Sequence, residues 1–172
     1  MTRRIVLVRH AKSSWEDESL PDHDRPLAPR GEAALPAMRA HVATLDLPAL
    51  IVLCSTAVRA AATFEGIRPA LSTDTRIESD RAFYYADEEE LLSRVARLGS
   101  EHESVMIVGH NPTLQDLACT LIGGGDAGAR GQIAAKVPTG SIMTMSVDRP
   151  WAALAPGAAH LDSLFMPRAP RT

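Results

Sequence analysis

Arginine and histidine side chains that could handle a phosphate group occur in three separate parts of the sequence. Arg9 and His10 are adjacent, Arg59 follows fifty residues later, and His110 lies further on. A guanidinium offers a planar fork of donors that matches two oxygens of a phosphate. A neutral imidazole can attack phosphorus through one ring nitrogen while a hydrogen bond orients the other. If these segments meet in the fold, they could bind a phosphate and accept it covalently.

Each of these segments follows a strand-length apolar run. The runs are residues 5–8 (IVLV), 50–54 (LIVLC) and 105–108 (VMIV), and none shows clean polar alternation. Such runs are typical of central strands that are covered on both faces. In a parallel sheet, ligands bind outside the carboxyl ends of the strands. The sequence therefore predicts that the arginines and histidines converge on one edge of a sheet.

Helical patterns separate the apolar runs. We expect helices over residues 31–45, 57–71, 87–98 and 112–122, the last with Pro at its start and Gly just beyond its end. Strands that alternate with helices in this way predict an α/β fold. The fold class we expect is a three-layer α/β/α domain with a central, mostly parallel sheet.

The rest of the chain predicts further strands at the edge of the sheet. Residues 141–147 alternate as a strand does, and residues 151–154 and 158–165 are interpreted as a hairpin around a Pro-Gly turn. Residues 123–131 are rich in glycine but follow a helix, so we expect a mobile surface loop and no phosphate-binding loop. Since there is no internal repeat or linker, residues 1–172 are predicted to form one domain.

Composition and charge exclude several classes of protein. The chain has 172 residues, 45% of them apolar and 23% charged, which suits a domain with a real core. The net charge is −3, so nucleic acid and anionic membranes are not expected partners. No apolar run approaches the length of a membrane span, and the run after the basic start is too short for a signal peptide. We expect a soluble, cytoplasmic protein with reduced cysteines.

Four short motifs occur in a fixed order. They are residues 7–13 (LVRHAKS), 24–31 (DRPLAPRG), 55–60 (STAVRA) and 109–112 (GHNP). Together they resemble the histidine phosphatase superfamily, and more closely its SixA-type phosphohistidine phosphatase branch. Many members have Gly after the Arg-His pair, whereas this chain has Ala11, which fits the SixA-like group better than the mutase-like one. The resemblance implies a phosphoglycerate-mutase-like fold.

The resemblance also implies roles for individual residues. His10 would be the nucleophile, and Arg9, Arg59 and His110 would complete the phosphate pocket. Arg25 would be a further phosphate or substrate contact, although it could equally anchor its own loop. Turnover would then have two steps, in which a phosphohistidine enzyme forms and water hydrolyses it. No metal ion or cofactor is implied.

A proton donor is harder to identify from the sequence. The larger branch of the superfamily has an acidic donor between the second arginine and the second histidine, where this chain has residues 83–88 (FYYADE). Asp87 or Glu88 could serve. A phosphohistidine carries a good leaving group once it is protonated, so it needs less acid catalysis than an alkyl phosphate. This favours a phosphoramidate substrate. Lys12 and Ser13 lie beside the site and could contact substrate or solvent.

Three interpretations of the function stay open. The first is a metal-independent phosphatase for a phosphorylated protein, such as a histidine phosphotransfer protein. The second is a phosphatase for a small phosphorylated metabolite. The third is a catalytically silent phosphoprotein-binding module, which would not need His10 as a nucleophile. Residues 22–24 (DHD) are predicted to form a polar loop, because three adjacent residues cannot easily face one metal ion.

Overall fold

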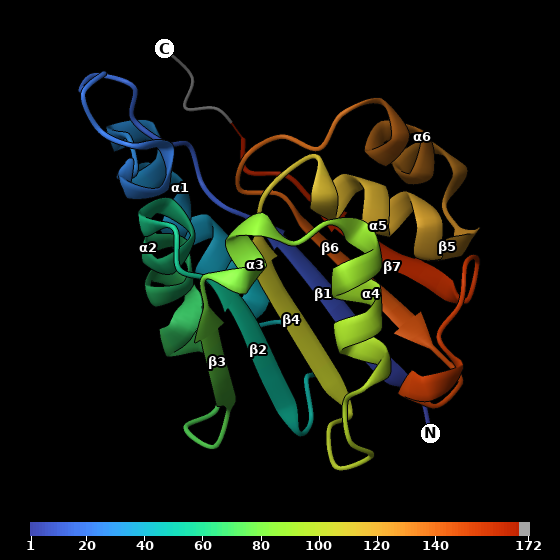
Figure 1. Ribbon diagram of the computed structural model, residues 1–172. Helices are drawn as coiled ribbons and strands as arrows, with labels where there is room; N and C mark the ends of the chain where they lie inside the picture. Colours follow the sequence, from blue (N-terminus) through green and yellow to red (C-terminus); the bar gives the residue numbers. More distant parts are fainter. Residues whose placement is uncertain (169–172) are drawn as a thin grey trace.

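One mixed sheet of seven strands, in the order β3-β2-β4-β1-β6-β7-β5, forms the middle layer of the molecule (Figure 1). The computed structural model describes residues 1–168. Strands β1 to β4 run parallel to one another, and β6 is antiparallel to its neighbours β1 and β7. The strands are β1 (Arg3–Arg9), β2 (Leu50–Ser55), β3 (Arg76–Asp80), β4 (Ser104–Gly109), β5 (Ile122–Gly125), β6 (Ile142–Val147) and β7 (Ala159–Phe165).

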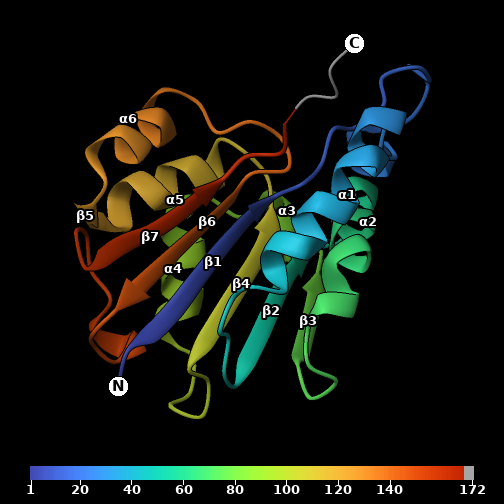
Figure 2. The ribbon, with the colours of Figure 1, turned by 180° about the vertical axis from the view of Figure 1, so that it is seen from behind.

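Helices cover both faces of this sheet (Figures 1 and 2). Two helices lie on one face, α1 (Pro29–Val42) and α2 (Val58–Ile67). Three lie on the other face, α4 (Glu88–Ala96), α5 (Thr113–Leu121) and α6 (Ala127–Ala135). The short helix α3 (Ala82–Tyr85) joins β3 to α4. The prediction of a three-layer α/β fold with a mostly parallel sheet is confirmed.

The central strand β1 explains why the apolar runs lack polar alternation. Ile5 and Leu7 belong to the core cluster beneath α4 and α5, while Val6 and Val8 belong to the cluster beneath α1 and α2. Successive side chains of a strand point to opposite faces, so both faces of β1 are apolar. All four side chains are completely buried. The sheet therefore offers a rigid support for the residues that follow its strands.

The loop after β1 is closed against the start of α1. Ala28 donates a backbone hydrogen bond to the carbonyl oxygen of Lys12 at 2.8 Å, and Ser13 forms an isolated antiparallel bridge with Leu27. A Cβ atom on Gly31 would lie 2.2 Å from the same Lys12 oxygen. Only glycine therefore allows α1 to approach the segment that follows β1.

In the predicted hairpin of residues 151–165, the second strand is confirmed as β7, but the first strand and the hairpin pairing are wrong. Residues Trp151–Ala153 form a short 3-10 helix, and β7 pairs with β6. The indole of Trp151 is buried, and its Nε1 donates to the carbonyl oxygen of His102 at 2.7 Å. Burial of Trp151 and its side-chain hydrogen bond thus fix residues 151–153, where we expected a hairpin strand.

The predicted mobile loop of residues 123–131 was also wrong. Its first part is β5, which pairs with β7 and forms an edge of the sheet, and its second part lies in α6. A Cβ atom on Gly123 would lie 2.1 Å from the carbonyl oxygen of Gly157, so a close backbone approach requires this glycine. Asp126 caps α6 by accepting a hydrogen bond from the backbone of Ala129 at 2.8 Å. Gly123 therefore allows close packing of the backbone and does not make this segment a mobile loop.

Three global features concern membrane spans, cysteines and domain organisation. Within residues 1–168, no helix is both long and apolar enough to cross a bilayer. Cys54 and Cys119 are both free. Burial raises the pKa of the Cys54 thiol to about 12, so this side chain is an un-ionised part of the core at neutral pH. That residues 1–172 form a single domain stays a prediction.

Candidate active site

The carboxyl ends of β1, β4 and β2 lie side by side at one edge of the sheet (Figure 1). His10 directly follows β1, and His110 directly follows β4. These two strands are parallel neighbours, and the centroids of the two imidazole rings lie 5.2 Å apart. Arg59, in the first turn of α2, reaches His10 from the other side. Residues separated by a hundred positions in the chain therefore meet at one edge of the sheet.

The hydrogen bonds of His10 define its tautomer. Nδ1 lies 2.7 Å from the carbonyl oxygen of Ala11, which can only accept, so Nδ1 carries the proton. Nε2 keeps a lone pair, and Nε of Arg59 donates to it at 3.3 Å. Burial lowers the pKa of His10 to about 4; the bond to Ala11 opposes this shift, while Arg59 and Arg9 add to it. At neutral pH the ring is therefore uncharged, and the electron pair at Nε2 accepts a hydrogen bond from Arg59.

Ala11, the residue that orients His10, is held by α2. The backbone N–H of Ala11 donates to Oγ1 of Thr63 at 2.9 Å, and this hydroxyl donates to the carbonyl oxygen of Arg59 at 2.6 Å. Thr63 is completely buried. One hydroxyl thus connects the backbone beside His10 to the helix that carries Arg59. The sequence did not reveal Thr63, because a threonine inside an amphipathic helix gives no distinctive signal.

Arg59 also contacts an acidic residue that the sequence analysis placed in a polar loop. Its Nη2 donates to Oδ2 of Asp22 at 2.9 Å, and its Nη1 donates to the Asp22 carbonyl oxygen at 2.5 Å. The hydroxyl of Tyr84, in α3, donates to the same Oδ2 at 2.8 Å. Burial raises the pKa of Asp22, but the hydrogen bonds from Tyr84 and Arg59 outweigh it and leave the pKa below its ordinary value. The site therefore contains an ionised carboxylate.

His110 is held by the last residue of β2. Its Nε2 lies 2.8 Å from Oγ of Ser55, which also accepts a hydrogen bond from the backbone of Ala57 at 3.2 Å. Burial is the main reason why the pKa of His110 is lowered to about 3, and His10 and Arg59 lower it further. This imidazole is neutral too, and its Nδ1 has no hydrogen-bond partner among residues 1–168.

Arg9 and Arg25 supply two further guanidinium groups. Nη1 of Arg9 donates to the carbonyl oxygen of Val137 at 2.6 Å, and burial lowers the pKa of this arginine. Nε of Arg25 lies 3.8 Å from Oδ1 of Asp22, and its guanidinium stacks 3.9 Å from the ring centre of Trp15. Within residues 1–168, Nε of Arg9 and both Nε and Nη1 of Arg25 are buried and make no hydrogen bond. These atoms are donors that an anion could satisfy.

The two acidic residues suggested by the sequence have structural partners instead. Asp87 caps α4 by accepting from the backbone of Glu90 at 2.9 Å, and Glu90 in turn accepts from the backbone of Asp87 at 3.0 Å. Oε1 of Glu88 accepts a hydrogen bond from Thr120 at 3.0 Å. Asp87 thus forms a capping box, and both residues stabilise α4. The suggestion that either one acts as the proton donor is not supported.

Lys12 and Ser13 contribute mainly through the backbone bonds that close the loop onto α1. The Lys12 side chain is exposed, and it lines a hollow of about 290 Å³ together with Arg30 and Arg168. Ser13 is buried. Within residues 1–168, no group of three or more His, Cys, Asp and Glu side chains is arranged to hold a metal ion.

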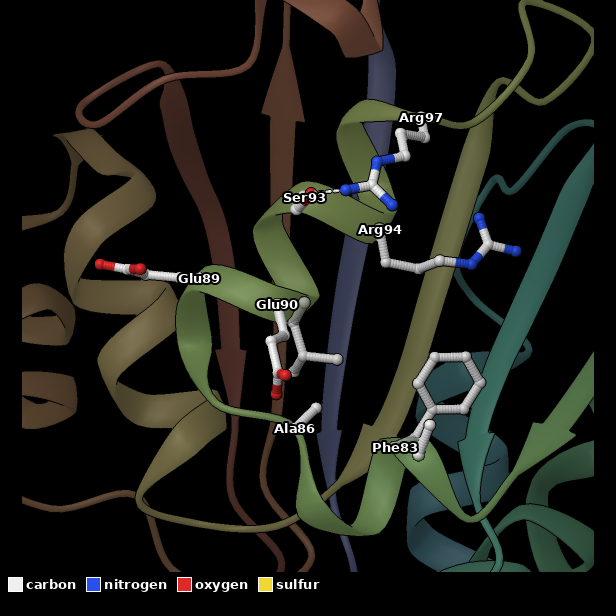
Figure 3. A pocket seen from close by; sticks show the side chains of 9 residues that line it. Phe83, Ala86, Glu89, Glu90, Ser93, Arg94 and Arg97 are labelled. Carbon is white, nitrogen blue, oxygen red and sulfur yellow. Dashed lines mark hydrogen bonds between the residues drawn. The ribbon is translucent and has the colours of Figure 1, made fainter.

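A separate hollow of about 470 Å³ lies beside α3 and α4 (Figure 3). Phe83 lines it, whereas the ring of the next residue, Tyr84, lies edge-on to His110 at 5.4 Å. Helix α3 thus separates this hollow from the histidines. Its lining includes Arg94 and Arg97 but neither His10 nor His110.

Comparison with known proteins gives consistent results. Residues 5–83 match the family description "Histidine phosphatase superfamily (branch 1)". The uncharacterized protein Rv1276c of Mycobacterium tuberculosis is 37% identical over 167 residues, which cover 94% of this chain and 100% of that protein.

Solved structures show which members of the superfamily resemble this chain. A candidate phosphohistidine phosphatase SixA from Nakamurella multipartitia has a TM-score of 0.81 and 27% identity, with 97% of both chains covered. The mycobacterial glucosyl-3-phosphoglycerate phosphatase Rv2419c has a TM-score of 0.61 and 14% identity, with 94% of this chain and 98% of that chain covered. The SixA-type structure is thus the more similar of the two in both fold and sequence.

Proposed function

Because the chain belongs to the histidine phosphatase superfamily, in its SixA-type branch, we propose that it hydrolyses a phosphohistidine or a related phosphate through a covalent intermediate on His10. The observation that carries this proposal is the state of His10. Its ring is neutral, its Nδ1 proton is held by Ala11, and its Nε2 lone pair lies against Arg59. A histidine that attacks phosphorus needs a neutral ring with one unprotonated nitrogen.

In the first step, Nε2 of His10 attacks the phosphorus atom of the substrate. The Nε2–P bond forms while the bond from phosphorus to the leaving nitrogen or oxygen breaks, and the leaving atom keeps the electron pair. The His10 ring then carries a positive charge, which the Ala11 carbonyl oxygen at Nδ1 stabilises. Arg9, Arg59 and His110 would donate to the phosphoryl oxygens, with Arg25 as a further contact. Phosphoryl transfer depends mainly on such positioning and charge stabilisation.

In the second step, water attacks the phosphorus atom of the phosphohistidine. The P–O bond forms, the Nε2–P bond breaks, and the electron pair returns to Nε2 of His10. Inorganic phosphate leaves, and the neutral ring with its proton on Nδ1 is restored. The guanidinium groups supply positive charge throughout, so the proposed mechanism needs no metal ion.

The substrate we propose is phosphohistidine on a protein, such as a histidine phosphotransfer protein. Two observations support it. The solved structure with a TM-score of 0.81 is described as a candidate phosphohistidine phosphatase. In addition, Asp87 and Glu88, the acidic residues considered as proton donors, are engaged in stabilising α4. An N–P bond needs less acid catalysis than an alkyl phosphate does.

A small phosphorylated metabolite is the second candidate substrate. The glucosyl-3-phosphoglycerate phosphatase has the same fold, at a TM-score of 0.61, and its name describes such a substrate. The same pocket chemistry would serve both classes, since each presents a phosphoryl group to His10.

Kinetics on three substrates test this proposal. A phosphohistidine peptide, an aryl phosphate and an alkyl phosphate are compared by kcat/KM, with His10→Ala as the inactive control. We expect the highest value for the peptide and no turnover of any substrate by the variant. A higher kcat/KM for the alkyl phosphate than for the peptide would favour a small phosphorylated metabolite as the substrate. Phosphopeptide binding without turnover by the unaltered chain would support the silent binding module.

A further inference from the structure

Asp22 is the carboxylate that contacts the phosphate-binding machinery directly. Its Oδ2 accepts hydrogen bonds from Nη2 of Arg59 and from the hydroxyl of Tyr84, at 2.9 and 2.8 Å. The role of Asp22 is not explained by binding a phosphate, because two anions repel each other. A carboxylate beside Arg59 must therefore have a role other than phosphate binding.

Asp22 lies beside the nitrogen that would carry the phosphoryl group. Nε of Arg59 donates to Nε2 of His10, and Nη2 of the same guanidinium donates to Asp22. The Nε–H group and the adjacent Nη2–H group of an arginine form one edge of its planar fork. The nucleophilic nitrogen and the carboxylate oxygen are therefore neighbours along one edge of Arg59.

An incoming phosphate would compete with Asp22 for this edge of Arg59. When phosphoryl oxygens take the Nη2 donor, the Tyr84 hydroxyl still donates to Oδ2 and keeps the carboxylate at the rim of the site. The Asp22 side chain is 51% exposed, so solvent water reaches it. The Asp22 carboxylate, which is accessible to water, would then lie next to the phosphorylated His10.

We propose, on the basis of the proposed function, that Asp22 is the general base for the water that hydrolyses the phosphohistidine intermediate. The carboxylate takes one proton from the water molecule as the oxygen bonds to phosphorus. The Nε2–P bond of His10 breaks in the same step, and its electron pair returns to Nε2. Asp22 then returns the proton to solvent, and inorganic phosphate leaves.

The protonation state of Asp22 agrees with a base and not with an acid. The hydrogen bonds from Tyr84 and Arg59 hold the pKa of this carboxyl below its ordinary value, so it is ionised before substrate binds. When the Arg59 guanidinium donates to the phosphoryl group instead, Asp22 loses one of these hydrogen bonds and gains a negative charge nearby. Both changes raise the proton affinity of Asp22 at the moment when water must be deprotonated.

The experiment is rapid-quench kinetics of Asp22→Asn on 4-nitrophenyl phosphate. The first step releases nitrophenolate, a leaving group that needs no proton donor, and attack by the neutral His10 ring needs no base. We expect a burst of about one equivalent of nitrophenolate per site, followed by steady turnover that is slower by on the order of 10²- to 10⁴-fold, the usual contribution of a general base. Quenching in alkali preserves the N–P bond, so mass spectrometry should find phosphorylated His10 accumulating.

Two results would overturn the role of Asp22. One is turnover like that of the unaltered chain. The other is slow turnover without a burst and without phosphorylated His10, which would mean that Asp22 only positions Arg59 for the first step. Failure of the proposed function looks different, because the unaltered chain would then show no turnover or His10→Ala would keep full activity.

Two further variants sharpen this test. Asp24→Asn is a matched control, since residues Asp22–Asp24 form one 3-10 helix, and Asp24 is exposed and contacts His23 at 2.9 Å. It should keep the kinetics of the unaltered chain. Tyr84→Phe removes the hydroxyl that positions Asp22. We expect it to keep the burst and slow the second step several-fold; a selective loss of the burst would contradict the proposal.

Discussion

His10 owes its reactivity to a small number of neighbours. A buried imidazole loses the solvation that stabilises its charged form, and here burial lowers the pKa to about 4. The carbonyl oxygen of Ala11 fixes the remaining proton on Nδ1, and Thr63 holds the backbone N–H of the same residue. A change in any of these contacts alters the nucleophile without touching the ring itself.

The charge state of His10 can be measured directly. Long-range ¹H–¹⁵N NMR of the ring nitrogens should show a neutral ring, protonated at Nδ1, throughout the range from pH 8 to pH 5. The reason is that burial holds the pKa near 4. The signal is assigned by its loss in His10→Gln. A titration midpoint near the ordinary histidine value of about 6.5 would contradict this account.

Arg59 acts through the shape of its guanidinium as well as through its charge. Arg59→Lys keeps the charge but loses the donors that now meet His10 and Asp22. We expect kcat/KM to fall by on the order of 10²- to 10³-fold, as when a donor to a transition state is removed. Arg68→Lys is the control, because Arg68 is exposed and pairs with Glu65 at 3.2 Å. Equal activity of the two variants would refute the role of Arg59.

Only part of this site could be predicted from the sequence. His10, Arg59 and His110 follow recognisable strands and lie in short motifs, so their convergence could be expected. Asp22 and Tyr84 could not be predicted, because no local pattern encodes the bends of the chain that bring Asp22 to Arg59 and Tyr84 to Asp22. Their contact joins residues 62 positions apart in the sequence.

The elements beside the site depend on close backbone contacts. Helix α1 approaches the carbonyl oxygen of Lys12 at Gly31, where a Cβ atom would lie 2.2 Å from that oxygen. Since backbone atoms cannot move aside as side chains do, a larger residue must shift the whole helix. The loop that contains Arg25 and Asp22 would move with it, because this loop ends at the start of α1.

A pair of glycine variants tests this helix position. Gly31→Ala should lower the free energy of unfolding by about 1–3 kcal/mol, the usual cost of overpacking, and should reduce activity as well. Gly131→Ala is the matched control, because Gly131 lies in α6 and a Cβ atom there would meet nothing within 4 Å. Chemical denaturation measures both. A Gly31→Ala variant as stable as the control would show that α1 tolerates displacement.

At the scale of elements, apolar runs and the alternation of residues 141–147 were better guides than glycine content. The runs at residues 5–8, 50–54 and 105–108 became central strands because burial on both faces leaves a continuous apolar signal. The loop predicted for residues 123–131 was wrong because Gly123 permits a close backbone approach to Gly157, which a sequence cannot show. Strand β3 was not predicted at all, since its side chains are mostly exposed and polar.

The whole molecule should lose stability in mild acid. The unfolded chain binds a proton on each histidine near the ordinary pKa of about 6.5, whereas the pKa of His10 is about 4 in the folded chain and that of His110 is about 3. Between these values the unfolded state binds more protons, so the free energy of unfolding falls as pH falls. The contribution is fully present above pH 6.5 and disappears as pH drops toward the folded pKa values.

Urea unfolding at pH 7.5 and pH 4.5 measures this effect. His10 alone should account for a loss on the order of 3 kcal/mol over its full titration range, because each unit of pKa shift corresponds to about 1.4 kcal/mol. His10→Gln removes this titration, so the variant should lose less stability between the two pH values. An equal loss in the variant and the unaltered chain would show that His10 is not held in its neutral form by folding.

Covalent phosphorylation of His10 is the claim on which the proposed function depends most. It is measured most directly by mixing the protein with a phosphohistidine peptide, quenching in alkali within milliseconds and mapping the phosphoryl group by mass spectrometry. We predict one phosphoryl group on His10 in the unaltered chain and none in His10→Ala. Rapid hydrolysis of the peptide with no phosphoryl group on His10 at any time, or equal turnover by His10→Ala, would contradict the account.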